Sequence, residues 1–511
     1  MEERMQSCWS KLLSRMGFAV LTVSFMVCLL ATVLFLLNPT QGLALNSLRF
    51  TRLQQVLPGY LQTEHKGWNV EAPITSLQNS TDDWNILYHL GGNGPWIDRL
   101  DGVVDGGVAV PSGCEVDMVH LMSRHAERYP TQKAGIRMLE MINRLKAHPE
   151  PFVGELSFLN NWTYFSDTPG QHFEQLTTTG PYAGVLEAFA TGVKLATRYG
   201  HLKNYTEKAV THVWACGCQR VIDTARHFSA GFFGLDNPHA QVITIPEDET
   251  RGGDTLTPGD TCLTYLSDLV HGHDNGAFQL AHFQTTYLPS IAERLSAVNP
   301  THPIKPADVY AMQELCGFEM LVRGSSPWCA VFTQEDWAQF EYARDLLHYY
   351  RAGPGTPYSI AMGSLWLNAT AELLLDGPEK RGSIFASFVH DGDVVPMITA
   401  LGIMEEEQKM PSDRFWEQRK WKTSQVTPMG GRVIFERLSC PTGKFVRVNV
   451  NDGIIPLPGC ADGPGSSCEL TRFSDYVGKR REKGGDFKKV CGLSDEAPEK
   501  IDFLRQPGYE R

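Results

Sequence analysis

Three stretches of this sequence follow one local plan, in which an apolar, strand-forming run leads into a short polar turn and then into a helical pattern. The strand-like runs span 116–122, 210–214 and 383–389. The polar turns that follow them hold, in the same order, Arg124 and His125, Arg220, and His390 and Asp391. In an α/β sheet such turns meet outside the carboxyl ends of the strands, where helices present free N–H groups. We therefore expect an α/β fold with one polar site built from all three turns.

The length of the chain and the remaining patterns predict more than one structural part. A chain of 511 residues exceeds what one compact core usually supports. The segment 237–350 lacks the strand and turn plan and carries helical patterns, so we predict a mainly α-helical cap there. The α/β body then comprises 113–236 and 351–511. Residues 38–112 are rich in Gly, Pro, Asn and Asp, which predicts an extended N-terminal arm.

The N-terminus predicts entry into the secretory pathway. Residues 17–37 are apolar or small and uncharged, and the basic residues of 1–16 precede them on the side expected to stay cytoplasmic. The run is longer than a signal-peptide core of about 7 to 15 residues. An uncleaved type II signal anchor therefore competes with cleavage near 42–44. We expect a secreted or cell-surface protein that is attached to the membrane only if this segment is retained.

Sequons and cysteines agree with an oxidising destination. The acceptor sequons all lie downstream of the apolar segment, at Asn79, Asn161, Asn204 and Asn368. Ten of the twelve cysteines lie there too. An even set in a secreted chain predicts disulfide bonds rather than metal ligands.

The charge balance argues against a nucleic-acid partner. The formal net charge is −12, and phosphate backbones are bound by basic surfaces. Any phosphate that this chain binds must therefore meet a local basic pocket. The one dense basic run, 479–489, is predicted to be a solvated face. No pattern fixes the oligomeric state, and a homo-oligomer is compatible with the sequence.

The turn Arg-His-x-x-Arg-x-Pro, which begins at Arg124, predicts phosphate chemistry. It places the guanidiniums of Arg124 and Arg128 beside the imidazole of His125. Guanidinium forks match phosphate oxygens, and a neutral imidazole nitrogen can attack phosphorus. Phosphoryl transfer also needs an acid for the leaving alkoxide and a base for water, and the carboxyl of Asp391 can serve as both in turn. Together with Arg220, one phosphate site explains these residues.

These segments resemble the histidine acid phosphatases, in particular the fungal branch of low-pH acid phosphatases and phytases. The resemblance is carried by 122–131, 219–228 and 389–391, with support from 87–96, 180–184 and 436–440. It implies an α/β body with an α-helical cap, His125 as the nucleophile that forms a phosphohistidine, and Asp391 as the proton donor. It implies phosphate binding by Arg124, Arg128, Arg220 and His390, without a metal or a cofactor.

The same resemblance implies four disulfide bonds: Cys114–Cys440, Cys262–Cys491, Cys316–Cys329 and Cys460–Cys468. Cys216 and Cys218 remain unmatched. A disulfide bond between these two cysteines would be strained. They could instead be buried free thiols, and a metal site is the least expected of the three alternatives. The segment 271–274, His-Gly-His-Asp, has ligand-like spacing but is predicted to be a polar loop.

Two positions depart from the pattern of this family. Ala126 stands where Gly is usual, and we expect its methyl group to lie beside the phosphate and to constrain the turn. Asp393 stands where many relatives have Asn, and a second carboxylate beside the site would repel substrate at neutral pH. Neither change removes a catalytic group.

The sequence therefore predicts a phosphoric monoester hydrolase of the acid phosphatase kind with a broad substrate range. The close alternative is a 3-phytase acting on inositol hexakisphosphate, for which Lys133 is one candidate pocket residue. An alternative of another class is an inactive surface protein that binds phosphorylated ligands. Because arginines hold His125 neutral in acid, where Asp391 keeps its proton, we expect an acidic optimum.

Overall fold

The computed structural model describes residues 84–204, 210–235 and 238–509. All of these belong to the second of two units into which the chain divides, 73–511. The expected signal segment 17–37, the first part of the N-terminal arm and the sequon at Asn79 lie outside the described residues. In the described part of the chain, none of the helices combines the length and apolar character that a membrane span requires.

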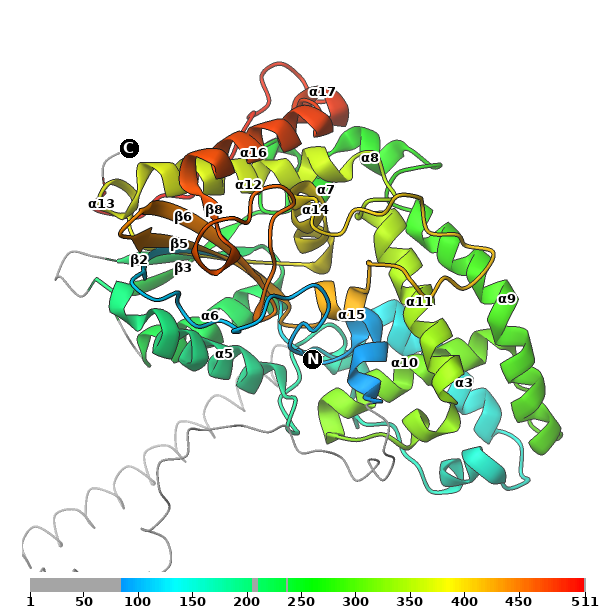
Figure 1. Cartoon of the computed structure of the whole chain (residues 1–511). Coiled ribbons are helices and arrows are strands. Elements are labelled where there is room, and N and C mark those ends of the chain that lie inside the picture. The colour runs from blue at the N-terminus through cyan, green and yellow to red at the C-terminus, as the bar shows by residue number, and fades with distance from the viewer. Residues whose placement is uncertain (1–83, 205–209, 236–237, 510–511) are drawn as a thin grey trace, which may run out of the picture. The chain divides into compact units, whose positions relative to one another are not determined.

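A mixed β-sheet forms the centre of the fold, which confirms the predicted α/β class (Figure 1). Its strands within the described residues are β1 (Glu115–Arg124), β2 (Thr211–Cys216), β3 (Ala240–Ile245), β4 (Ile384–Val389), β5 (Arg432–Cys440), β6 (Gly443–Val450), β7 (Gly453–Ile454) and β8 (Cys468–Glu469). Their order is β3-β2-β4-β1-β5-β6-β7, and β8 pairs with β6. The first four strands in this order are parallel, and β5, β6 and β7 continue the sheet in antiparallel pairs.

Helices cover both faces of the sheet, which explains why the central strand β4 is buried along its whole length. Every residue of β4 is buried. Figure 1 shows α5 (Gly184–Tyr199) and α6 (Gln219–Phe233) on one face, and α12 (Ser359–Asp376) and α16 (Leu470–Gly484) on the other. The sequence of β4 is therefore a nearly continuous apolar run, without the alternation of apolar and polar residues that a half-exposed strand shows.

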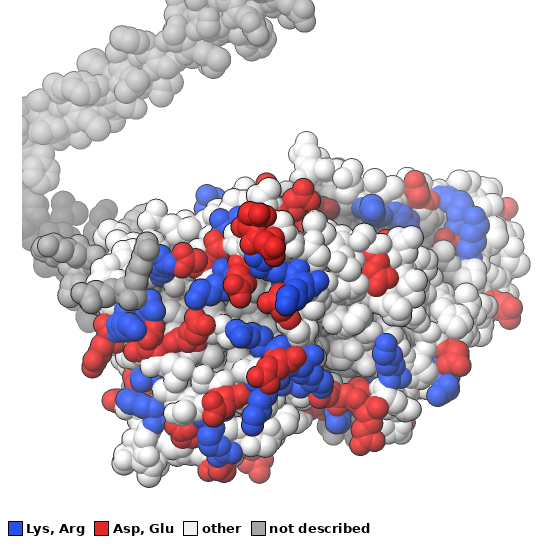
Figure 2. Space-filling model, turned by 90° about the horizontal axis from the view of Figure 1, so that it is seen from above, with Lys and Arg blue, Asp and Glu red and all other residues white. Residues whose placement is uncertain are grey.

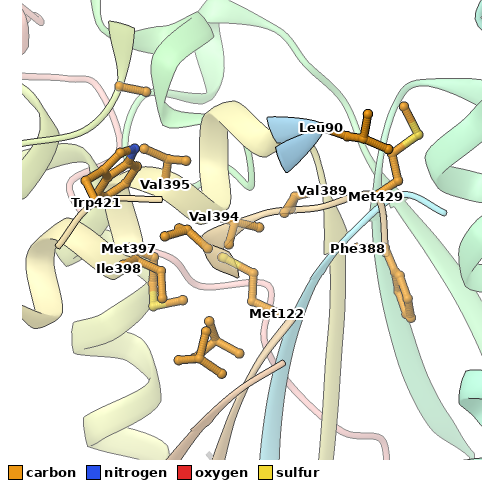
Figure 3. Close-up of a cluster of buried hydrophobic side chains, with 14 of the residues drawn as sticks. Leu90, Met122, Phe388, Val389, Val394, Val395, Met397, Ile398, Trp421 and Met429 are labelled. Atoms are coloured by element: carbon orange, nitrogen blue, oxygen red, sulfur yellow. The ribbon is translucent and has the colours of Figure 1, made fainter. Parts of the chain in front are cut away.

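The hydrophobic core extends directly beneath the carboxyl ends of β1 and β4 (Figure 3). Met122 from β1 and Phe388 and Val389 from β4 are buried there, together with Val394 from α14 (Asp391–Leu401). The turns that follow these strands thus start from residues fixed by close packing, which limits how far their polar side chains can move.

A group of long helices lies beside the sheet: α3 (Gln132–Lys146), α9 (Asn275–Val298), α10 (Pro306–Arg323) and α11 (Gln334–Arg351). Three of them fall in the expected cap range 237–350. The expected start of that range is wrong, however, because Ala240–Ile245 forms β3 of the main sheet. Its alternating, β-branched sequence favours a strand, but the turn after it has no Arg or His to mark it.

Short elements connect these parts. They are the helices α4 (Pro169–His172), α7 (Pro258–Thr261), α8 (Leu263–Ser267), α13 (Pro378–Arg381), α15 (Thr423–Val426) and α17 (Phe487–Cys491), and the 3-10 turns η1 (Ile86–His89), η2 (Gly91–Asn93), η3 (Gly154–Asn160), η4 (Gly200–Leu202), η5 (Glu249–Arg251), η6 (Pro327–Val331) and η7 (Pro464–Ser466). The described end of the N-terminal arm is fastened to α15, where the Gln425 side chain accepts hydrogen bonds from the backbone of Leu100 and Asp101.

The surface carries the charged side chains and the sequon residues that the sequence contains. Acidic and basic side chains are interspersed on the face that Figure 2 shows. Two members of the basic run in α16, Arg480 and Lys483, pair with Glu405 at 2.7 and 2.8 Å. The sequon residues Asn161 and Asn204 are exposed, and Asn368 is partly exposed on α12.

The structure contains the four disulfide bonds that the family resemblance implied, and Cys216 and Cys218 are free thiols. The bond Cys114–Cys440 links the residue before β1 to the last residue of β5 across 326 positions of sequence. It therefore closes a loop that contains most of the sheet.

Replacing both partners, Cys114→Ser with Cys440→Ser, is expected to lower the free energy of unfolding by about 2 to 5 kcal/mol, because the unfolded chain regains the freedom of a long loop. Denaturant unfolding of the purified variant measures this loss. The matched control is Cys218→Ser, which removes a thiol that bridges nothing. Equal midpoints for the double variant and the unchanged protein would contradict the prediction.

Candidate active site

The three polar turns predicted from the sequence meet at one edge of the sheet. The strand β4 lies between β1 and β2, and all three are parallel. Their carboxyl ends therefore place His125, Arg220 and His390 side by side. The backbone N–H of His125 donates to the carbonyl of Val389 at 2.9 Å, so the pairing of β1 with β4 continues into the turn.

The side chain of His125 is buried and held in one tautomer. Its Nδ1 lies 2.8 Å from the carbonyl oxygen of Ala126, and a carbonyl can only accept. In the neutral ring Nδ1 therefore carries the hydrogen and Nε2 keeps its lone pair. Burial, followed by the charges of Arg124, Arg128 and Arg220, lowers the pKa of His125 well below its usual value. The site thus holds an uncharged imidazole with a free nitrogen in mildly acidic solution.

Arg124 is fixed from two sides. Its Nη1 donates to the carbonyls of Gly92 and Thr427, both at 2.8 Å, and its Nη2 lies 3.0 Å from a carboxylate oxygen of Asp391. Burial opposes ionisation of Asp391, but the neighbouring positive charges, that of Arg124 first, outweigh it and hold the pKa of Asp391 well below its usual value. A phosphate dianion held by Arg124 would offset this effect and favour protonation of Asp391.

Arg128 and Arg220 add further positive charge. The Nη1 of Arg128 donates to the carbonyl of Tyr129 at 2.9 Å, and Arg220 lies in the first turn of α6. Burial, with repulsion from Arg124 and Arg220, lowers the pKa of Arg128 to about 9. The Nε–H groups of Arg124, Arg128 and Arg220 are buried, and no described residue accepts a hydrogen bond from them. Buried donors of one charge favour an anion with several oxygens.

His390 joins this cluster through both ring nitrogens. Its Nδ1 lies 3.3 Å from Nη2 of Arg220, and its Nε2 lies 3.3 Å from a carboxylate oxygen of Glu247. Burial lowers the pKa of His390, but hydrogen bonds with Cys216, Cys218 and Glu247 outweigh it and raise that pKa well above its usual value. A protonated His390 donates from both ring nitrogens: Nε2 faces Glu247, and Nδ1, which then cannot accept from Arg220, is available to a phosphate oxygen.

The two departures from the family pattern have local roles that the sequence did not predict. Asp393 is buried and accepts a hydrogen bond from the backbone N–H of His390 at 3.0 Å, as part of the capping box of α14. Burial raises its pKa to about 8. Asp393 therefore caps a helix, and its raised pKa opposes the charge at neutral pH that was expected to repel substrate.

The methyl group of Ala126 is fully buried and packs in a small apolar cluster with Leu176 and Ala188. The methyl group therefore lies against apolar side chains, whereas the sequence led us to expect it beside the phosphate. The backbone N–H of Ala126 donates to the hydroxyl of Thr224 at 3.1 Å, and that hydroxyl donates to the carbonyl of Arg220 at 2.7 Å. The turn after β1 and the start of α6 are joined through this hydroxyl.

Helix α11 supplies site residues that the sequence reasoning missed. Arg344 and His348 lie 3.3 Å apart on it, and both contribute to the electrostatic environment of Asp391. Burial lowers the pKa of His348 to about 3, so this ring is neutral. The spacing of Arg344, His348 and Arg351 along one face of the helix was the available signal. By contrast, Lys133 is exposed on α3.

The segment 271–274, with its ligand-like spacing, makes only local side-chain ion pairs among the described residues, as expected of a polar loop. His273 lies 2.8 Å from the carboxylate of the adjacent Asp274, and His271 lies 3.7 Å from that of Asp268. These exposed pairs are local to their own turns.

Comparison with known proteins identifies the family to which this chain belongs. The sequence model of the histidine phosphatase superfamily, branch 2, matches residues 115–451. The chain belongs to this family. Similar curated proteins include a phytase of Candida albicans, 34% identical over 84% of this chain and 92% of the relative, and an acid phosphatase of Komagataella pastoris, 34% identical over 81% and 88%.

Comparison with solved structures supports the same family. The crystal structure of the phytase from D. castellii superposes with a TM-score of 0.77 at 30% identity and covers 86% of this chain and 94% of that chain. A multiple inositol polyphosphate phosphatase of Bifidobacterium longum is 16% identical with a TM-score of 0.54, over 75% and 96% of the two chains, and thus shares the fold.

The close approach of η2 to the site gives a test. A Cβ atom on Gly92 would lie 3.2 Å from Nη1 of Arg124 and 3.3 Å from Nε2 of His348. We therefore expect Gly92→Ala to displace Arg124 and to lower kcat/KM for a phosphate ester by roughly tenfold or more, since small misplacements are costly. Steady-state kinetics measures this effect. As a control, Gly478→Ala adds a methyl with no atom within 4 Å, and an equal loss in both variants would refute the explanation.

Proposed function

We propose that this chain is a secreted or cell-surface acid phosphatase that hydrolyses phosphate monoesters through a phosphohistidine at His125. The observation that carries the proposal is the buried imidazole of His125, which keeps a free Nε2 among three guanidiniums. Acid phosphatases and phytases among its relatives support the same activity. The disulfide bonds support an oxidising, secretory destination.

In the first step, Arg124, Arg128, Arg220 and His390 would hold the phosphate oxygens. The Nε2 of His125 attacks phosphorus while the bond to the leaving oxygen breaks. Asp391 donates its proton to that oxygen, so the alcohol departs neutral. The products of this step are the alcohol, a phosphohistidine and the Asp391 carboxylate.

In the second step, the carboxylate of Asp391 takes a proton from a water molecule as that water attacks the phosphohistidine. The P–N bond breaks, inorganic phosphate leaves, and His125 and protonated Asp391 are restored. Because Arg124 contacts Asp391 directly, the same guanidinium can hold phosphate and position the acid.

Nucleophile and acid variants separate this enzyme from an inactive phospho-ligand-binding protein. Hydrolysis of p-nitrophenyl phosphate by the full chain is expected to fall by at least about a thousandfold in His125→Ala and by at least about a hundredfold in Asp391→Asn, because each removes a group that acts in the transition state. His273→Ala, which changes a partly exposed histidine outside the site, is the matched control. Equal rates for His125→Ala and the unchanged chain would refute the assigned nucleophile.

The phytase alternative has its own support. The relatives from Candida albicans and D. castellii are phytases, and Arg344 and Arg351 on α11 bring additional guanidiniums near Asp391. Hydrolysis of phytate alongside p-nitrophenyl phosphate distinguishes the two. A kcat/KM for phytate well above that for simple monoesters would favour the phytase, and the reverse would favour a broad acid phosphatase.

The lowered pKa of His125 predicts activity in acid. Since an imidazole attacks only when neutral, the acid limb of the kcat/KM profile should lie well below pH 6.5, and activity should remain near its maximum at about pH 5. Activity should fall as the pH rises toward and above neutrality, because Asp391 ionises readily and keeps the proton that the leaving group needs only where bound phosphate offsets the charge of Arg124. A pH–rate profile tests this expectation. A maximum above neutrality, or an acid limb close to pH 6.5, would disprove it.

A further inference from the structure

Three metal-ligand side chains gather beside the phosphate-binding residues, at the carboxyl ends of β2, β3 and β4. Cys216 is the last residue of β2, Glu247 follows β3, and His390 follows β4. One ligand atom from each, a thiol sulfur, a carboxylate oxygen and a ring nitrogen, lies within 4.8 Å of the other two. The proposed hydrolysis uses His390 but gives no role to the thiol.

The sheet itself holds this group together. In the pairing of β2 with β3, Cys216 lies opposite Ile245, so Glu247 emerges beside it. The Glu247 carboxylate accepts a hydrogen bond from the backbone N–H of Cys218 at 3.1 Å and lies 3.3 Å from Nε2 of His390. Cys216 is fully buried. The three donors therefore stand on adjacent strand ends rather than on separate loops.

Thiolate, imidazole and carboxylate together are a ligand set suited to zinc and to other thiophilic divalent cations. The second ring nitrogen of His390 faces Arg220 at 3.3 Å, so Nε2 is the nitrogen turned toward the other two donors. The half-buried thiol of Cys218, two residues from Cys216, lies 3.3 Å from Nη1 of Arg220.

We propose that Cys216, Glu247 and His390 bind a thiophilic divalent cation such as Zn²⁺ and that this binding inhibits the enzyme. The cation replaces the thiol proton of Cys216 and any proton on Nε2 of His390, and these protons are released. The binding stands on the ligand geometry alone. The inhibition rests on the proposed function, because it acts through His390.

Metal binding would inhibit the enzyme because the ligand atoms must move closer together to coordinate the ion. Zinc holds its ligand atoms about 3.3 to 3.8 Å apart, given bonds of about 2.0 to 2.3 Å in a tetrahedron. Cys216 belongs to the packed interior strand β2, whereas Glu247 and His390 are side chains in turns, so closing the set draws the carboxylate of Glu247 and the imidazole of His390 toward the thiol. That movement draws the imidazole from Arg220 and from the phosphate, and a shift of about 1 Å can cost up to about a hundredfold in rate.

Titration of the full, chelator-treated chain with Cd²⁺ and Zn²⁺ tests the proposal. Cd²⁺ should produce a thiolate-to-metal charge-transfer band, and saturating Zn²⁺ should lower p-nitrophenyl phosphate hydrolysis at least tenfold, with recovery after addition of chelator. Each variant is compared with itself, with and without metal. Cys216→Ser and Glu247→Gln should lose the band and the inhibition, and the control His273→Ala should keep both.

The outcomes are distinct. A band or inhibition that survives in Cys216→Ser would overturn the site, as would a disulfide between Cys216 and Cys218 found by peptide mapping of the native chain. If Cys216→Ser fails to fold, Glu247→Gln replaces it in the test, because Glu247 is partly exposed and its replacement should leave the fold intact. Binding without inhibition would overturn the coupling through His390. Should the chain lack phosphatase activity, the charge-transfer band and its loss still decide the metal site, so the two failures can be told apart.

Discussion

The buried positive charge at the carboxyl ends of β1, β2 and β4 is the constraint on which the rest of the site depends. Arg124, Arg128 and Arg220 surround His125, and burial is the first cause that lowers the pKa of Arg128 to about 9. Such a cluster is costly unless anions compensate it. Asp391 supplies one carboxylate through its contact with Arg124, and the buried Nε–H groups of the three arginines find no acceptor among the described residues.

The fold holds these buried charges close together by fixing the backbone segments that carry them. The ends of β1 and β4 sit on the core shown in Figure 3, and the hydrogen bond from His125 to Val389 extends their pairing into the turn. The hydroxyl of Thr224 then ties Ala126 to the start of α6. The arginines therefore face one another because strands and helix ends hold them, which is the preorganisation that stabilisation of developing charge requires.

Sequence reasoning recovered the parts of the site that lie close together along the chain. Arg124, His125 and Arg128 share one turn, and Arg220 and Asp391 each follow a recognisable strand, so the motif and the strand pattern together predicted them. Residues brought in by tertiary packing gave a weaker signal. His348 belongs to a helix of the predicted cap, and Glu247 follows β3, a strand that was missed because its turn lacks basic residues. The environment of Ala126 depends on partners such as Leu176, distant in sequence, and could not be read from the motif, whereas the helix cap made by Asp393 is local.

The most direct test of the central claim is to trap the covalent intermediate. The full chain is mixed with excess phosphate ester in mild acid, quenched in alkali within the first turnovers, and mapped by mass spectrometry, because a phosphohistidine survives alkali and not acid. Our account predicts phosphate on the peptide that contains His125 and none in His125→Ala. Turnover with phosphate on another residue, or with no phosphorylated peptide under conditions that preserve phosphohistidine, would contradict it.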